Sequence, residues 1–446
     1  MSYKSELQKM FDLQKFGIKL GLDSMKSILA RLGQPQAGRR FVHLAGTNGK
    51  GSVGAMLQSV LSAAGYGVGF YTSPHLVTFR ERIKIGAEMI SEKDVLSLSA
   101  RVWAATDPQS APTFFEFVTA MAFLYFAEKK TDLDIIEAGL GGRLDSTNVI
   151  ENPLTTAITN IALEHTEHLG ATLALIAGEK AGIIKTGVPL VTGALPPEAA
   201  EVIWRRALEL KSPALIPGRD FTVETTSFDR QGRPTINYRS GALVLESLEL
   251  GLAGPHQADN AAVAITICEQ LAGRGFPLEE KHLRAGLRQV AWPGRAETFP
   301  AGAWPPQGSP ARAPLLLDGA HNPAGAEALA RHLQTMTYDQ LHLIVGVMAD
   351  KDITGVLGPI LPMADHLYLT RPAFSRAASP GLLWDRITAA FGPPRVPTTL
   401  HPTIPEAFQA AAAEARESDL VLLSGSLFTV GEGRAWLQGL SEVESN

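Results

Sequence analysis

The glycine-rich segment 45–52, AGTNGKGS, has the residue types that bind a phosphate chain. Glycines let backbone N–H groups approach phosphate oxygens, and a lysine, here Lys50, can reach the terminal phosphates. A hydroxyl at Thr47 or Ser52 could lie near a metal ion. The segment departs from the standard phosphate-loop pattern, because its first glycines are closer together and a glycine separates Lys50 from Ser52. The alternative is a glycine-rich turn that binds nothing.

A strand and a helix are predicted on either side of this segment. Phe41–Ala45 is a short apolar run, and apolar residues recur at helical spacing from Val53 onward. The order strand, glycine loop, helix puts the loop at a helix N-terminus, whose positive end attracts anions. The sequence therefore predicts a phosphate-binding loop.

Polar residues also follow three other predicted strands, at the edge of a parallel sheet where ligands collect. They are Ser73 after strand 68–72, Glu137 in strand 133–138 and His165 after strand 155–161. A hydroxyl, a carboxylate and an imidazole could together hold Mg²⁺, although imidazole is an unusual magnesium ligand. Each residue also has a simpler interpretation: Ser73 caps a turn, Glu137 pairs with Arg143, and His165 is a loop histidine no better placed than His168.

Lys180 lies among small and apolar residues in the segment GEKAGIIK. Such a lysine could lose its charge through burial or through reaction with carbon dioxide. A surface ion pair with Glu179 is the alternative. Further along the chain, Arg295 follows Pro and Gly at a predicted domain boundary, and Asp318 and His321 lie at a strand end, so these three are candidates for a second side of the site.

Composition excludes several classes of protein. The chain has 446 residues, of which 45% are hydrophobic and 19% charged, with a formal net charge of -5. A nucleic-acid partner is not expected, because no basic run is present. The N-terminus lacks the apolar core of a signal peptide, and the one cysteine, Cys268, is expected in the core. We therefore expect a cytoplasmic protein without a membrane partner.

The predicted fold is α/β with two domains. Residues 1–295 are predicted to form a phosphate-loop-type, mostly parallel doubly wound sheet with an added antiparallel section at 221–250. Residues 79–85 alternate apolar and charged side chains and are expected to form an exposed ribbon. A proline- and glycine-rich stretch, 292–314, begins at the boundary. Residues 296–446 are predicted to form a smaller Rossmann-like α/β domain, with strands at 315–318, 341–346, 366–370 and 420–423.

Nine segments in this order resemble the folylpolyglutamate synthase/dihydrofolate synthase family of the Mur ligase superfamily. They are AGTNGKGS (45–52), TSPHL with ERI (72–83), TFFE (113–116), EAGLGGRLDSTN (137–148), LEHTEHLG (163–170), GEKAGI (178–183), GPHQADNAA (254–262), PGR (293–295) and DGAHNP (318–323).

The resemblance implies roles for individual residues. It implies nucleotide contacts by Thr47, Asn48, Gly49, Lys50, Gly51, Ser52, Asn260, Arg295 and Asp318, and magnesium ligands at Ser73, Glu137 and His165. It implies a carbamylated Lys180 that helps to hold a second Mg²⁺. It also implies a pterin-side pocket at Thr113, Phe114, Phe115, Glu116, Leu144, Asp145 and Ser146, and a glutamate side at His321 and Ser426. The family usually has Asp where Glu164 stands, so this position departs from the family pattern and the resemblance implies no role for it.

The implied activity is ATP-dependent joining of glutamate to a pterin or folate carboxylate through an acyl phosphate, with Lys50, Lys180 and His321 as catalytic residues. Both dihydrofolate synthase and folylpolyglutamate synthase activity are expected, because Arg143-Leu-Asp145 resembles bifunctional members. The alternatives are a Mur-type ligase with another carboxylate acceptor, a regulatory nucleotide-binding protein that is not a ligase, and a simple kinase. The expected partners are the small-molecule substrates alone, with the protein a monomer.

Overall fold

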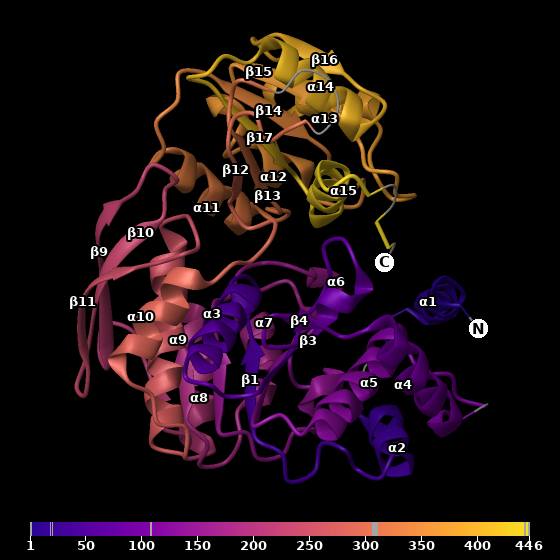
Figure 1. The fold of residues 1–446 in the computed structure, drawn as a ribbon, viewed down its shortest axis with the longest axis vertical. Coiled ribbons are helices and arrows are strands. Elements are labelled where there is room, and N and C mark those ends of the chain that lie inside the picture. Colours follow the sequence, from indigo (N-terminus) through magenta and orange to yellow (C-terminus); the bar gives the residue numbers. More distant parts are fainter. Residues whose placement is uncertain are drawn as a thin grey trace.

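The computed structural model describes residues 2–17, 19, 21–107, 109–305, 311–440 and 443–444. Helices and strands alternate along the chain, so the predicted α/β class is confirmed. Two large sheets lie one above the other in Figure 1, the N-terminal part below and the C-terminal part above. Of the predicted boundary stretch, residues 306–310 lie outside the described residues.

The N-terminal part is built on an eight-stranded sheet in the order β4-β3-β2-β5-β1-β6-β7-β8. All neighbouring strands run parallel except at one edge, where β3 pairs antiparallel with β2, and β4 pairs antiparallel with β3. The strands are β1 (Phe41–Ala45), β2 (Val68–Tyr71), β3 (Ile83–Ile85), β4 (Glu88–Met89), β5 (Leu133–Glu137), β6 (Thr155–Ile158), β7 (Leu190–Thr192) and β8 (Ala214–Leu215).

Helices cover both faces of this sheet, as the alternating side chains of β1 require. Val42 and Leu44 pack in the core with α3, α9 and α10, whereas Phe41 packs on the other face with α1, α2, α4 and α5. A third cluster joins β6 and β7 to α7 and α8. These helices are α1 (Tyr3–Phe11), α2 (Asp23–Arg31), α3 (Lys50–Ala63), α4 (Glu92–Ala105), α5 (Phe114–Lys129), α7 (Leu173–Lys180), α8 (Pro197–Glu209), α9 (His256–Ala272) and α10 (Glu280–Gln289).

The predicted antiparallel section is present and forms a three-stranded sheet of its own, in the order β11-β10-β9. Its strands are β9 (Phe221–Phe228), β10 (Pro234–Ser240) and β11 (Val244–Glu249). It packs beside α9 and α10 at the left of Figure 1. Cys268, on α9, is buried in this core as expected.

The expectation of an exposed ribbon at 79–85 is wrong. Phe79–Arg82 forms a 3₁₀ helix that begins with a capping box between Thr78 and Glu81, and only Ile83–Ile85 is a strand. Phe79 and Arg82 are buried. The alternating pattern misled because the capping box starts a helical turn, in which Phe79 and the charged Arg82 are both buried.

The C-terminal part is a six-stranded sheet in the order β12-β13-β17-β14-β15-β16, parallel except for β12. Its strands are β12 (Glu297–Phe299), β13 (Leu315–Asp318), β14 (Leu341–Val345), β15 (His366–Leu369), β16 (Thr398–Leu400) and β17 (Leu420–Ser424). Its helices are α11 (Pro323–Leu333), α12 (Ile353–Leu357), α13 (Pro380–Phe391), α14 (Ile404–Glu414) and α15 (Leu427–Leu437). Strands β12 and β16 and helix α15 were not predicted from the sequence. Within the described parts of the chain, no helix is long and apolar enough to cross a membrane.

Candidate active site

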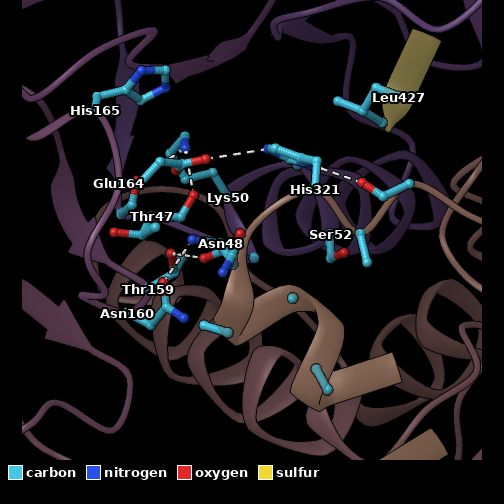
Figure 2. A pocket seen from close by; sticks show the side chains of 18 of the residues that line it. Thr47, Asn48, Lys50, Ser52, Thr159, Asn160, Glu164, His165, His321 and Leu427 are labelled. Atoms are coloured by element: carbon cyan, nitrogen blue, oxygen red, sulfur yellow. Dashed lines mark hydrogen bonds and ion pairs between the residues drawn. The ribbon is translucent and has the colours of Figure 1, made fainter. Parts of the chain in front are cut away.

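A cavity of about 680 Å³ is lined by residues of both large sheets. Many of these residues lie in the loops after β1, β2, β5 and β6 on one wall, and after β13 and β17 on the other, and helices α7, α9 and α11 add further ones. The loops leave the C-terminal ends of parallel strands, the edge at which ligands collect in doubly wound sheets. Figure 2 shows side chains from both parts around one space.

The loop 46–52 joins β1 to α3, as predicted. Gly46 has a φ of 150°, and a Cβ there would lie 2.0 Å from Thr159 Oγ1, so a side chain is excluded. The Asn48 N–H donates to Asn160 Oδ1 at 2.7 Å, and Thr159 Oγ1 donates to the Asn48 carbonyl at 2.6 Å. A glycine precedes α3 and provides no side-chain cap, which leaves the first N–H groups of the helix for an anion.

Lys50 folds back over this loop. Its Nζ donates to the carbonyls of Gly46 at 2.9 Å and Thr47 at 3.1 Å, and lies 3.8 Å from Glu137 Oε1. The Thr47 hydroxyl donates to the Ala162 carbonyl at 3.2 Å, so its proton is already used within the protein. Because Lys50 Nζ contacts the backbone of this loop, its ammonium group lies where the terminal phosphates of a nucleotide would bind.

The three predicted magnesium ligands line the same cavity. Ser73 follows β2, and Glu137 ends β5. His165, whose φ is 50°, directly precedes the short helix α6 (Thr166–Leu169). His168 lines the cavity as well. The interpretation of Glu137 as a partner of Arg143 is wrong, because Arg143 Nη2 lies 2.8 Å from Glu179 Oε1.

Glu137 has the surroundings of a metal ligand. Thr72 Oγ1 donates to its Oε2, and burial raises its pKa while the Lys50 charge opposes that rise. Its carboxylate and the Ser73 hydroxyl are hard oxygen donors of the kind that Mg²⁺ prefers, so these residues fit the ion.

Lys180 is buried, with 5% of its surface exposed, and its Nζ donates to the Gly46 carbonyl at 2.8 Å. Burial, together with the Lys50 charge, lowers the pKa of Lys180 to about 7. The surface ion pair with Glu179 that the sequence left open is wrong, since Glu179 binds Arg143. Lys180 therefore exists in both the charged and the uncharged form near pH 7, and it shares the Gly46 carbonyl with Lys50.

The opposite wall carries the predicted C-terminal residues. Asp318 ends β13 and accepts the N–H groups of Ala296 and Ala320, each at 2.9 Å. Burial raises the pKa of Asp318, and the charge of Arg295 opposes that rise. Ser426 is the N-cap of α15 and accepts the Thr429 N–H at 3.0 Å. Arg295, Asp318, His321 and Ser426 all line the cavity.

A polar contact joins the two walls, and Figure 2 shows its central pair. His321 Nε2 lies 3.2 Å from Glu164 Oε1, which also accepts Asn322 Nδ2 at 3.0 Å. The Asn48 and Asn322 amides bond each other in both directions, at 3.2 and 3.0 Å. Burial alone would raise the pKa of Glu164, but His321 and Asn322 lower it below its usual range.

Sequence reasoning missed the interdomain role of Glu164 and the loop-holding residues Thr159 and Asn160. The strand-end rule that found Ser73 could have found the latter two, because they follow β6 directly. Asn260, which was predicted, lines the cavity beside Gly49, and its Nδ2 donates to Gln257 Oε1 at 2.9 Å.

The predicted pterin-side residues form a layer behind the cavity lining. Thr113 and Glu116 form the capping box of α5, and Phe115 packs on Gly139, where a Cβ would lie 2.5 Å from the ring. Asp145 Oδ2 accepts the Leu140 N–H at 2.8 Å. The lining includes Gly139 and Leu140 but not the seven predicted residues Thr113, Phe114, Phe115, Glu116, Leu144, Asp145 and Ser146.

A buried hydrogen-bond chain orients Asp145. Thr147 Oγ1 donates to Asp145 Oδ1 at 2.5 Å and lies 2.8 Å from His43 Nε2. The Thr147 proton is used by the carboxylate, so His43 Nε2 must donate to the hydroxyl. Burial lowers the pKa of His43 to about 3, which keeps the imidazole neutral.

Comparison with known proteins supports this organisation. Residues 307–427 match the family model described as "Mur ligase, glutamate ligase domain". The dihydrofolate synthase/folylpolyglutamate synthase of Bacillus subtilis is 39% identical over 382 residues, covering 83% of this chain and 85% of that protein. The chain spans about half the length, 53% and 50%, of two relatives from Halobacterium salinarum and Haloferax volcanii, whose names pair a folylpolyglutamate synthase with a dihydropteroate synthase.

Solved structures are similar over the whole chain. Escherichia coli FolC in complex with DHPP and ADP has a TM-score of 0.87 at 29% identity, covering 98% of both chains. Mycobacterium tuberculosis folylpolyglutamate synthase, complexed with ADP and AMPPCP, has a TM-score of 0.86 at 31% identity, covering 98% of this chain and 99% of that one. The chain therefore belongs to the folylpolyglutamate synthase/dihydrofolate synthase family of ATP-dependent ligases.

Proposed function

We propose that the protein joins L-glutamate to the carboxylate of dihydropteroate, of a reduced folate, or of each in turn. The carboxylate attacks the γ-phosphate of ATP, which gives an acyl phosphate and ADP. The glutamate amine then attacks the acyl carbon, the amide bond forms, and inorganic phosphate leaves with the electrons of the broken C–O bond.

One observation carries this proposal: the cavity has a phosphate loop on one wall and a cluster of polar residues on the other. Lys50 and Arg295 both line the cavity and would offset charge on the transferred phosphoryl group. Contact between Glu164 and His321 holds the walls together and would exclude water, which otherwise hydrolyses an acyl phosphate. A protein that only senses nucleotide does not require this second wall.

The nucleotide is proposed to bind Thr47, Asn48, Gly49, Lys50, Gly51, Ser52, Asn260, Arg295 and Asp318, which all line the cavity. We propose Ser73, Glu137 and His165 as ligands of Mg²⁺, which when bound offsets charge on the phosphate oxygens. Glu137 and Ser73 support this choice as oxygen donors beside the lysine of the loop.

Lys180 is proposed to react with carbon dioxide, losing a proton and forming a carbamate that ligates a second ion. The lowered pKa of Lys180 supports this reaction, because only the uncharged amine attacks carbon dioxide. Carbon-13 NMR of protein in labelled bicarbonate would give a carbamate signal that Lys180→Met abolishes. An unchanged spectrum in the variant would contradict the assignment.

The substrate residues are proposed to divide between the two walls. His321 and Ser426 lie on the C-terminal wall and would bind glutamate. The layers 113–116 and 144–146 would shape the pterin side through Gly139 and Leu140.

We further propose that residues 1–295 and 296–446 are two domains that close on the substrates. The protein is proposed to be monomeric and cytoplasmic, in keeping with a single buried cysteine.

The test is ADP release by purified protein with ATP, Mg²⁺ and glutamate, adding dihydropteroate or tetrahydrofolate separately. Release that requires both glutamate and an acceptor supports the proposal, and the acceptor that works identifies the activity. Tight ATP binding without acceptor-dependent release would overturn it in favour of another carboxylate acceptor or a regulatory role.

A further inference from the structure

Residues after α15 lie against the N-terminal part of the molecule. Val443 and Glu444 follow this last helix, and Figure 1 shows the chain coming down from α15 toward the N-terminal part. The Glu444 N–H donates to the Val77 carbonyl at 3.0 Å, and Val443 packs against a hydrophobic cluster of the C-terminal part. These two residues therefore contact both parts.

The Glu444 carboxylate accepts hydrogen bonds from two separate segments. Its Oε2 accepts the Phe79 N–H at 2.6 Å, the Thr78 hydroxyl at 2.8 Å and the hydroxyl of Tyr3, on α1, at 3.2 Å. Burial and the Glu444 charge raise the pKa of Tyr3, so its hydroxyl keeps the proton that it donates. Because hydrogen bonds to a charged acceptor are stronger than neutral ones, Glu444 ties α1 to the turn at residues 78–79.

The main chain of Glu444 also holds His75. Arg82 Nε donates to His75 Nδ1 at 2.8 Å, so the ring proton is on Nε2, which donates to the Glu444 carbonyl at 2.7 Å. His75 is 3% exposed, and both of its ring nitrogens have partners. Loss of the Glu444 carbonyl would leave a buried N–H without an acceptor, which is unfavourable.

Segment 75–79 also enters the core of the C-terminal part. Leu76 and Val77 are 7% and 5% exposed and belong to one buried cluster with side chains of that part, among them Val430 of α15. A Cβ at Gly431 would lie 2.1 Å from the Leu76 carbonyl oxygen, so α15 approaches the main chain of the segment as closely as glycine allows. The segment is thus held by α15 and by the residues after it.

This segment begins next to the proposed metal ligand Ser73. Ser73 lies two residues before His75, and its N–H donates to the carboxylate of Glu137. Ser73 and Glu137 both line the catalytic cavity. A displacement of residues 75–79 would therefore move the Ser73 hydroxyl relative to the Glu137 carboxylate.

We propose that Glu444 is a positioning residue that fixes segment 75–79 and thereby holds the Ser73 hydroxyl beside Glu137 for the metal ion. This inference rests on the proposed function, in which Ser73 and Glu137 are metal ligands. Glu444 is not among the described residues that line the cavity, so it acts through the segment and not through contact with a substrate. A residue that only stabilised the fold would leave metal affinity unchanged, so the two roles predict different results.

The experiment measures Mn²⁺ binding by the full-length protein with the ATP analogue AMPPCP bound and the protein in excess over the analogue. Mn²⁺ prefers the same oxygen ligands as Mg²⁺, and electron paramagnetic resonance detects the free ion. Glu444→Ala removes the side-chain acceptor and is expected to weaken Mn²⁺ binding about 3–10-fold. Glu444→Gln keeps an acceptor oxygen without the charge, so its loss should be smaller. The dissociation constant of AMPPCP without metal should not change, because loop 46–52 is untouched.

The matched control is Glu417→Ala, which removes an exposed glutamate between α14 and β17 and is expected to bind Mn²⁺ normally. A chain that stops after Leu440 lacks every Glu444 contact and should lose at least as much Mn²⁺ affinity as Glu444→Ala. A lower melting temperature with unchanged Mn²⁺ affinity in Glu444→Ala would overturn the proposal and make Glu444 a structural contact only. Because Mn²⁺ binding needs no turnover, a failure of acceptor-dependent ADP release in the unaltered protein would overturn the proposed function and is distinguished from this outcome.

Discussion

The phosphate loop on the N-terminal wall of the cavity is held by hydrogen bonds within a single sheet. Asn160 and Thr159 bind its backbone from the next strand, and Lys50 and Lys180 share the Gly46 carbonyl. The C-terminal wall instead meets this loop through polar side chains from a different sheet, chiefly those of residues 321 and 322.

The two walls therefore suit two different tasks of a ligase, nucleotide binding by the loop and movement of the second wall. A loop fixed by buried backbone bonds can bind a nucleotide without any movement of the other wall. A wall that meets the loop through a few polar side chains can move away from the loop for the substrates and return for the reaction. Changes to the loop should therefore lower catalysis most strongly, and changes at the junction should lower catalysis less while leaving nucleotide binding nearly intact.

Lys50→Met is expected to have the largest effect. Removing a charge that stabilises the transferred phosphoryl group should lower kcat by about 10²–10³-fold. Glutamate-dependent ADP release measures this effect, and Lys185→Met, which removes a half-buried lysine bonded to Asn148, serves as the matched control. A Lys50→Met enzyme with normal kcat would show that the loop lysine has no catalytic role.

Lys180→Met tests the buried amine of the same wall through pH. In the folded protein the pKa of Lys180 is about 7, against an ordinary value of 10.5. Below pH 7 both the folded and unfolded states carry the proton, so the cost of burying the charge is fully present. Between pH 7 and about 10 mainly the unfolded state binds this proton. The free energy of unfolding therefore rises with pH, by up to about 1.4 kcal/mol per pH unit from this group.

The Lys180→Met variant has no titrating amine at this position, so it serves as the reference. Its melting temperature in buffer free of carbon dioxide should exceed that of the unaltered protein most at pH 6.5, and the gap should shrink by pH 9. A gap that stays constant across this range would mean that Lys180 keeps its charge in the folded protein.

Glu164→Gln tests the junction. The variant keeps the shape of the side chain but loses the charge that faces His321, so closure should weaken and kcat should fall about 10–100-fold, or about 1.4–2.7 kcal/mol. The dissociation constant of ADP should change less than about 3-fold, because the loop is untouched. Glu201→Gln, on the surface of α8, is the control. Equal losses in ADP affinity and kcat would contradict the division between the walls.

The same division explains how much the sequence could predict. The loop wall follows from local pattern, since a strand, glycines and a helix are adjacent in sequence and parallel strands end at one edge. Ser73 and Glu137 were found by this rule, and the structure brings them to the cavity with Lys50.

The junction could not be predicted from the residues, because Glu164 and Asn322 are 158 positions apart and meet only through the placement of one sheet on another. For the same reason the strand-end rule did not reveal that residues 113–116 and 144–146 lie behind the lining. The resemblance to a family identified those residues, but it could not show that they lie behind the cavity lining rather than in it.

The smallest expected effect concerns the amide pair Asn48–Asn322, the direct link between loop and second wall. Asn322 is also the N-cap of α11, where its Oδ1 accepts the Gly325 N–H at 2.8 Å, so Asn322→Ala alone damages the helix as well as the junction. A double-mutant cycle with Asn48→Ala removes this complication, because the capping loss is the same with either residue at position 48. We expect a coupling energy of about 0.5–1.5 kcal/mol in kcat/KM for glutamate-dependent ADP release. The same cycle measured on ADP affinity should give a smaller coupling, since most of the proposed nucleotide contacts lie on the loop wall and only Arg295 and Asp318 lie on the other. Coupling of equal size in both measurements would mean that the walls are already joined when nucleotide binds, and that the second wall is as firmly fixed as the first.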